Sequence, residues 1–412
     1  MASFRRRPYV VTLAFVGAAI LMALIVRIAS AGQARVDAET TGATQLSPAE
    51  LEKKYEEVSQ LLVTTDYRPR SFSDRDNKYE EAKQFLDMTP VVSSTPYVEG
   101  HAHPKSDALK EPDLYSKKIL QAMERAHAVG LVIFSSPFGP DERVPYDDDM
   151  IARVVNGHGE MLAWLGGGGS LNPMMLDAVR LNNTGSETQR KVREVAEKIL
   201  RNGASGFGEI TLEHLAVGAT QTYDHMPPDN PLMLLLADIA AEHGVPILIH
   251  MEVIPQKMSI PADLKRPPNP LELQDNLTAF KRLLTHNPRT KILWAHAGLD
   301  NTGYRTPELM GRLLKAYPNL YMDIKIVPAR LAKNPPFSAD GTVKPDWLKL
   351  FQDFPDRFMV GSDQSYSPDP GAMTAPGSLR TSVLLVNQLP KDLERKIGRE
   401  NAFRFYSFGQ AK

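Results

Sequence analysis

The chain has 412 residues, of which 42% are hydrophobic, so it holds enough apolar material for one large domain or two of ordinary size. Lys and Arg together number 48 and Asp and Glu 49, a balance that excludes the basic excess typical of nucleic-acid-binding proteins. Cysteine is absent, which excludes disulfides and thiolate ligands, so histidine, carboxylate or water must hold any bound metal.

The first 31 residues have the order of a secretory signal. Arginines at positions 5–7 form a basic head, residues 10–26 form an apolar run without charge, and an Ala-Ser-Ala cleavage sequence ends at Ala31. The apolar run is also just long enough for a tilted membrane span. We therefore expect an exported protein in the periplasm or another extracytoplasmic space. It is either soluble after cleavage near Ala31 or associated with the inner membrane through residues 10–26.

Residues 32–96 are predicted to form a polar, partly helical extension. Ser47-Pro48-Ala49-Glu50 is a capping box with proline at the first helical position, and apolar residues then recur at helical spacing as far as Leu62. We assign this segment no role beyond that of a spacer that packs on the main domain.

Residues 97–408 alternate between short apolar runs and amphipathic stretches, a pattern that predicts a parallel sheet with connecting helices. Strands are expected at Tyr97–Gly100, Gly130–Ser135, Met161–Leu165, Ser205–Ile210, Val245–His250, Lys291–His296, Leu320–Ile324 and Phe358–Gly361. Helices are expected at Leu114–Ala128, Glu187–Arg201, Pro231–His243, Leu271–His286, Thr306–Tyr317, Pro345–Phe354 and Ser378–Asn387. Eight such units predict a closed (β/α)8 TIM barrel. An open doubly wound sheet is the alternative, which the absence of a G-x-G-x-x-G motif at a helix start disfavours.

Ionisable residues stand at the carboxyl ends of five of these strands. His101 and His103 follow the first strand, and as residues i and i+2 of an extended chain they face the same side. The fourth, fifth, sixth and eighth strands end at Glu209, His250, His296 and Asp363. Each residue alone is explained as well by an ordinary structural hydrogen bond. Together the six predict a metal centre, because ionisable groups that close apolar strands are costly unless paired or ligated, and barrel enzymes keep their sites at this end.

The ordered set E-x-H-x-H, G-E-I, I-H, A-H-A-G and G-S-D resembles the amidohydrolase superfamily in its amidohydrolase family 2 branch. The closing Gly398-Arg399-Glu400-Asn401-Ala402 resembles the segment that follows the barrel there, so the resemblance covers about residues 97–408. It implies that His101, His103 and Asp363 bind one metal and that His250 and His296 bind a second. Glu209 stands where many members have a bridging carboxylated lysine, and is similar to the bridging glutamate of TatD-like members. Glu99 stands where the family usually has Asp.

The resemblance implies a metal-dependent hydrolase that cleaves an amide, ester, lactone or phosphoester bond of a small molecule. A bound divalent ion lowers the pKa of its water from about 15.7 to about 7, and Asp363 is expected to act as general base. The donors suit one or two ions per chain, with Zn favoured and Mn, Fe or Co as alternatives. We expect no nucleic-acid partner, and the sequence predicts no oligomeric state.

Lys325 and Trp294 are the candidate substrate contacts. The ammonium of Lys325, at the end of the seventh strand, is expected to meet either an anionic group of the substrate or the carboxylate of Asp323 or Glu252. Trp294 precedes His296 by two residues and is expected to form either a wall of the site or part of the core. Of the histidines outside the ligand set, only His214 is expected beside the centre.

Two further functions stay open on the same fold. In a decarboxylase or hydratase with one metal, His101, His103, His250 and Asp363 would hold the ion and His296 would be an acid/base; the presence of Glu209 favours the hydrolase. An exported binding protein without catalysis is disfavoured by the complete ligand set, and a nuclease by the acidic balance of a chain cleaved after Ala31.

Overall fold

The computed structural model describes residues 93–104, 110–142, 148–218, 221–325, 333–338, 342–366 and 383–409. All of them belong to one of the two compact units of the chain, residues 69–338 with 342–412. The predicted signal or anchor at residues 1–31, and the predicted extension up to residue 92, lie outside the described residues. Among the helices that are described, none is both long and apolar enough to cross a membrane.

Parallel strands in chain order form the centre of the fold. They are β1 (Tyr97–Pro104), β2 (Ala128–Phe134), β3 (Leu162–Gly167), β4 (Phe207–His214), β6 (Pro246–Met251), β9 (Lys291–Ala297), β10 (Leu320–Ile324), β11 (Phe358–Val360) and β12 (Gln364–Tyr366). From β1 to β10 each strand pairs with the next one in this order, so that β10 pairs with β11, and β12 pairs with β1. Because β11 and β12 are two halves of one eighth strand, the ring is a nearly closed barrel, which confirms the predicted (β/α)8 class.

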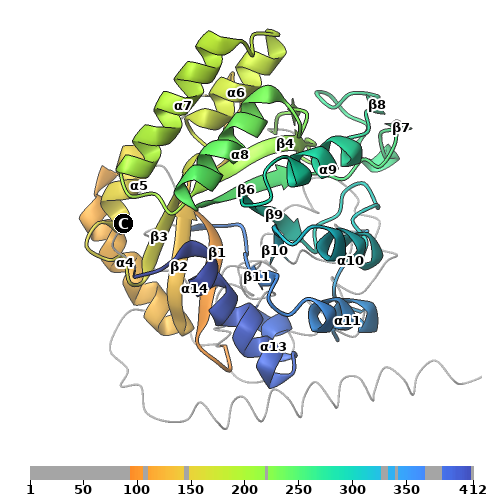
Figure 1. The fold of residues 1–412 in the computed structure, drawn as a ribbon. Helices are drawn as coiled ribbons and strands as arrows, with labels where there is room; N and C mark the ends of the chain where they lie inside the picture. Colours follow the sequence, from red (N-terminus) through yellow and green to blue (C-terminus); the bar gives the residue numbers. More distant parts are fainter. Residues whose placement is uncertain are drawn as a thin grey trace, which may run out of the picture. The chain divides into compact units, whose positions relative to one another are not determined.

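Helices surround the strands, as Figure 1 shows. They are α4 (Pro112–Ala126), α5 (Asp148–Val155), α6 (Leu171–Arg180), α7 (Ser186–Arg201), α8 (Pro231–His243), α9 (Leu277–His286), α10 (Pro307–Ala316), α11 (Pro345–Asp353), α13 (Lys391–Arg395), a π turn (Lys396–Glu400) and α14 (Asn401–Tyr406). Of the helix predicted at residues 378–387, residues 383–387 are described and helical.

One predicted helix needs correction, and two helices were missed. The helix predicted from Leu271 begins only at Leu277, because Glu272–Leu273 (β8) pairs with Met258–Ser259 (β7) in a small antiparallel ribbon. Helices α5 and α6 were not predicted. Pro173 obscures the start of α6, but it lies in the first turn, where its missing N–H leaves no helical hydrogen bond unmade.

Side chains fill two layers of core. Alternate residues of the strands point into the barrel, where Val132, Leu165, Leu248 and Leu293 pack with Phe405 and Tyr406 of α14. The residues between them, such as Ile292 and Trp294 on β9, point outward against the helices. Tyr406 also donates a hydrogen bond from its hydroxyl to the carbonyl of Gly100 (3.0 Å), so the terminal helix is fastened to β1.

Candidate metal centre

All six predicted ligand residues lie together at the carboxyl ends of the strands. Their side-chain donor atoms form overlapping groups in which His101, His103 and Glu209 make one set and Glu209, His250 and His296 make another. Asp363 joins the first set, since its Oδ1 lies 2.9 Å from His103 Nε2 and 3.6 Å from His101 Nε2. The six come from five separate strands, so the closure of the barrel is what collects them.

The first set has the spacing of donors around one ion. His101 Nε2 lies 3.3 Å from His103 Nε2 and 3.4 Å from Glu209 Oε2, and His103 Nε2 lies 3.6 Å from the same oxygen. Around a tetrahedral zinc with bonds of about 2.0–2.2 Å, donor atoms lie about 3.3–3.6 Å apart. With Asp363 Oδ1 as the fourth member, these residues fit a divalent ion.

The second set has three donors. Glu209 Oε1 lies 2.9 Å from His250 Nδ1 and 3.1 Å from His296 Nε2, and the two imidazole nitrogens lie 3.1 Å apart. Three donors on one side are typical of catalytic zinc sites, in which water or substrate supplies the remaining ligand. The two oxygens of Glu209 therefore face different histidine pairs, which is the arrangement that a carboxylate between two ions needs.

The charges in the cluster depend on one another. Burial raises the pKa of Glu209, but the positive charge and hydrogen bond of His101 outweigh it and hold the pKa of this carboxyl well below its usual value. Burial lowers the pKa of His101, yet Asp323 and Glu209 together raise it well above the usual value. Burial lowers the pKa of His296 to about 4, so its imidazole is neutral. A metal that binds here must therefore displace the proton on His101.

Backbone bends aim two of these side chains. His296 has φ 69° and Asp363 has φ 54°, both in the left-handed region that most residues avoid. At His296 the pairing of β9 with β10 also shifts register, as it does at a β-bulge. The bend turns His296 into the mouth of the barrel, although the outward side chain of Trp294 stands only two residues before it.

Asp323 on β10 holds the cluster from behind, a role that the sequence did not reveal. Its Oδ2 accepts a hydrogen bond from His101 Nδ1 (2.8 Å), and its Oδ1 accepts one from the backbone N–H of His296 (2.5 Å). It is fully buried. The hydrogen bond from Nδ1 leaves the lone pair of His101 Nε2, which lies 3.4 Å from Glu209 Oε2, available to bind a metal. The sequence did contain one signal of this role, since Asp323 is a carboxylate one residue before the end of a predicted apolar strand.

Glu99 joins the first and eighth strands. Its Oε1 accepts the backbone N–H groups of His101 (3.0 Å) and Ser362 (2.8 Å), while Oε2 is buried without a hydrogen-bond partner among the described residues. Burial raises the pKa of this carboxyl to about 7. Glu99 therefore positions the backbone on both sides of the cluster and is not one of the donors.

The three residues predicted around the cluster lie in different places. Lys325 reaches it, since its Nζ donates a hydrogen bond to Asp363 Oδ2. Trp294 does not, because its ring is fully buried against Phe280 in the outer core and its Nε1 donates to the carbonyl of Met251 (2.9 Å). His214 lies beside the cluster, with its ring centroid 5.0 Å from that of His250.

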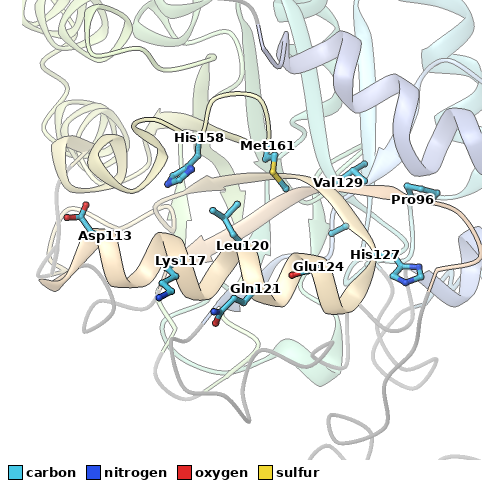
Figure 2. A pocket seen from close by; sticks show the side chains of 11 residues that line it. Pro96, Asp113, Lys117, Leu120, Gln121, Glu124, His127, Val129, His158 and Met161 are labelled. Atoms are coloured by element: carbon cyan, nitrogen blue, oxygen red, sulfur yellow. The ribbon is translucent and has the colours of Figure 1, made fainter. Parts of the chain in front are cut away.

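A separate groove of about 820 Å³ runs along α4. Figure 2 shows its lining, which includes Pro96 before β1, Val129 near the start of β2 and Met161 before β3. It therefore lies at the amino-terminal ends of the strands and contains none of the six ligand residues. In TIM barrels that end serves stability, whereas the catalytic residues stand at the opposite end.

Comparison with known proteins identifies the family of the chain. A family model described as Amidohydrolase matches residues 191–408, more than half of the chain. The chain belongs to the amidohydrolase family. The match includes four of the six predicted ligand residues of this amidohydrolase, from Glu209 to Asp363, whereas His101 and His103 precede it. No curated protein matches the chain.

Solved structures with similar folds include three barrels. An uncharacterised TIM-barrel protein from Bordetella bronchiseptica is 14% identical over 76% of this amidohydrolase and 98% of its own chain, with a TM-score of 0.44. A dihydroxybenzoic acid decarboxylase from Polaromonas sp. JS666 with bound manganese is 12% identical over 77% and 98%, with a TM-score of 0.45. Dihydroorotase from Campylobacter jejuni is 13% identical over 79% and 88%, with a TM-score of 0.41.

Proposed function

We propose that this amidohydrolase is a metal-dependent hydrolase that holds two divalent ions and cleaves an amide, ester, lactone or phosphoester bond of a small molecule. The observation that supports two ions is the position of Glu209. One of its oxygens faces the His101 and His103 pair and the other faces the His250 and His296 pair. Zn is the proposed metal, and the same oxygen and imidazole donors also suit Mn, Fe or Co.

Ions bound in these two sets would supply Lewis acidity, which makes water acidic near neutral pH and polarises a carbonyl or phosphoryl oxygen. The residues of the chain then move the protons. Although burial opposes ionisation, the ammonium of Lys325 holds the pKa of Asp363 well below its usual value, so this carboxylate is ionised at neutral pH. We propose that Asp363 orients the attacking water, accepts its proton and passes it to the leaving group.

The test starts with elemental analysis of the purified full-length protein, followed by a panel of esters, lactones, amides and phosphoesters. We expect close to two ions per chain and turnover of at least one bond class. Asp363→Asn should abolish turnover while much of the metal stays bound. Near-normal turnover of Asp363→Asn would show that the general base is a different residue, and a metal-free protein with turnover would refute the proposal.

A decarboxylase or hydratase with one metal is the second candidate, and a specific feature of His296 favours it. Metal-bound histidines nearly always donate their second ring N–H to an acceptor. His103 Nδ1 has such an acceptor in the carbonyl of Phe134 (3.0 Å), whereas His296 Nδ1 is buried without a partner among the described residues. One ion per chain, with carbon dioxide released from a carboxylic acid substrate and no hydrolysis, would establish this function instead.

The location outside the cytoplasm is also a proposal, supported by the sequence order of residues 1–31. Amino-terminal sequencing of the native protein tests cleavage: a mature end just after Ala31 is expected for a soluble form. An intact amino terminus in the membrane fraction indicates an anchor, and an intact amino terminus in the cytoplasmic fraction would refute export.

A further inference from the structure

Lys325 carries a positive charge into the cluster that metal binding does not require. It follows β10 directly, and its backbone N–H is fixed to the carbonyl of Ala297 (3.0 Å). Its side chain is 18% exposed, so most of it is shielded from bulk water.

The two oxygens of Asp363 have different partners. Oδ1 faces the His101 and His103 pair, while Oδ2 accepts the ammonium of Lys325 and lies 3.9 Å from His296 Nε2. The contact with Lys325 therefore leaves Oδ1 available as a metal donor. It also places the ammonium beside both donor sets, where the reacting end of a substrate must lie.

Charge balance changes when the site is filled. The cluster contains the buried carboxylates of Glu209 and Asp323 and the partly buried one of Asp363, and two divalent ions would more than neutralise these three charges. If an ion binds to Asp363, the negative charge of this carboxylate is largely neutralised and no longer balances the charge of Lys325. A poorly solvated ammonium without a counter-ion is energetically unfavourable. The guanidinium of Arg305 is a buried cation of the same region, but it already donates to the backbone carbonyls of Ala295 and Trp294 (3.0 Å to Trp294).

We infer that Lys325 binds a carboxylate of the substrate, so that the substrate is a small organic anion with its hydrolysable bond close to that carboxylate. This inference rests on the proposed function. A carboxylate supplies the single negative charge that the ammonium lacks once Asp363 is shared with a metal. An ammonium on a flexible stem recognises such a group as a point charge.

The test measures binding and does not depend on turnover. The full-length protein is loaded with Zn, its metal content is measured, and succinate or its neutral analogue succinamide is titrated in by calorimetry. Wild-type protein should bind succinate and bind succinamide at least about tenfold more weakly, as expected for a charged hydrogen bond. Lys325→Met should weaken succinate binding by about tenfold or more with unchanged metal content, and Lys325→Arg should recover much of it.

Lys333→Met is the matched control, because Lys333 is also a lysine of the loop after β10 but pairs with Asp263 on the surface (3.4 Å). It should leave succinate binding unchanged. Equal succinate affinity in wild type and Lys325→Met would overturn the inference, as would loss of metal from both Lys325 variants, which would make Lys325 a structural partner of Asp363. Succinate binding that depends on Lys325, in a protein that hydrolyses nothing, would instead refute only the proposed hydrolysis.

Discussion

Replacement of Asp323 by asparagine tests whether the residues behind the cluster set its affinity for metal. Both groups that Asp323 accepts are donors, the ring Nδ1–H of His101 and the backbone N–H of His296. Asparagine offers one oxygen and one NH2 group, so in Asp323→Asn one of these donors must face another donor. The backbone N–H cannot change, whereas the imidazole can move its proton to Nε2, which then no longer serves as a metal donor.

The expected size of this effect follows from the single lost contact. Removal of a partner that orients a metal-bound histidine typically costs about 10–100-fold in metal affinity, which corresponds to about 1.4–2.7 kcal/mol. We expect Asp323→Asn to fall in this range while the barrel stays folded. Competition with a chromogenic chelator measures the affinity, and circular dichroism measures the fold.

Asp224→Asn is the matched control for loss of a buried carboxylate. Asp224 is nearly buried and accepts a hydrogen bond from the Thr222 hydroxyl (2.5 Å), but it belongs to none of the donor groups. Its metal affinity should equal that of the wild type. An unchanged affinity in Asp323→Asn, or an equal loss in the control, would refute the argument that Asp323 acts through His101.

Three further variants test other parts of the structure. His101→Ala combined with His103→Ala should remove the bound metal and leave a folded barrel, as elemental analysis and circular dichroism will show; retained metal would refute the ligand assignment. Trp294→Phe should lower the free energy of unfolding by about 2 kcal/mol, because the Met251 carbonyl loses its buried donor, with kcat/KM unchanged; a changed substrate preference would contradict its place in the core. Burial and the nearby His250 lower the pKa of His214 to about 4, so the unfolded chain binds this proton below pH 6.5 and the folded chain does not. As the pH falls from 7 to 5, the free energy of unfolding of the metal-free wild type should therefore decrease by about 2 kcal/mol more than that of His214→Gln, as measured by urea unfolding. An equal decrease in both proteins would contradict this prediction.

The barrel was predictable from the sequence because strand-length and helix-length patterns alternate over the whole domain. Pro231–His243 is a helix with the predicted bounds, and the eight strands lie where apolar runs were found. The boundaries that failed depend on pairing between segments. Glu272–Leu273 has a partner only because Met258–Ser259 folds back beside it, and the local pattern around Leu271 contains no sign of this.

The meeting of the six side chains was predictable for a different reason. His, Glu and Asp are rarely placed at the ends of apolar strands without a partner, so their residue type and position carry information about a shared site. The role of Asp323 behind the cluster was not predicted, since this residue lies within β10 and its partner His101 is 222 residues away in the chain. A contact across the barrel depends on closure, which no local window of sequence contains.

Trp294 shows where the strand rule itself fails. By simple alternation, Trp294 and His296 would share a face, and both would line the site. The left-handed backbone at His296 (φ 69°) breaks that alternation, so the imidazole enters the mouth while the indole stays in the outer core. Asp363 (φ 54°) also has a left-handed backbone, between β11 and β12, where the eighth strand is interrupted. His296 is thus brought into the cluster by a strained backbone conformation, which supports a functional origin for the strain there, because an ordinary extended strand would have turned its side chain outward with that of Trp294.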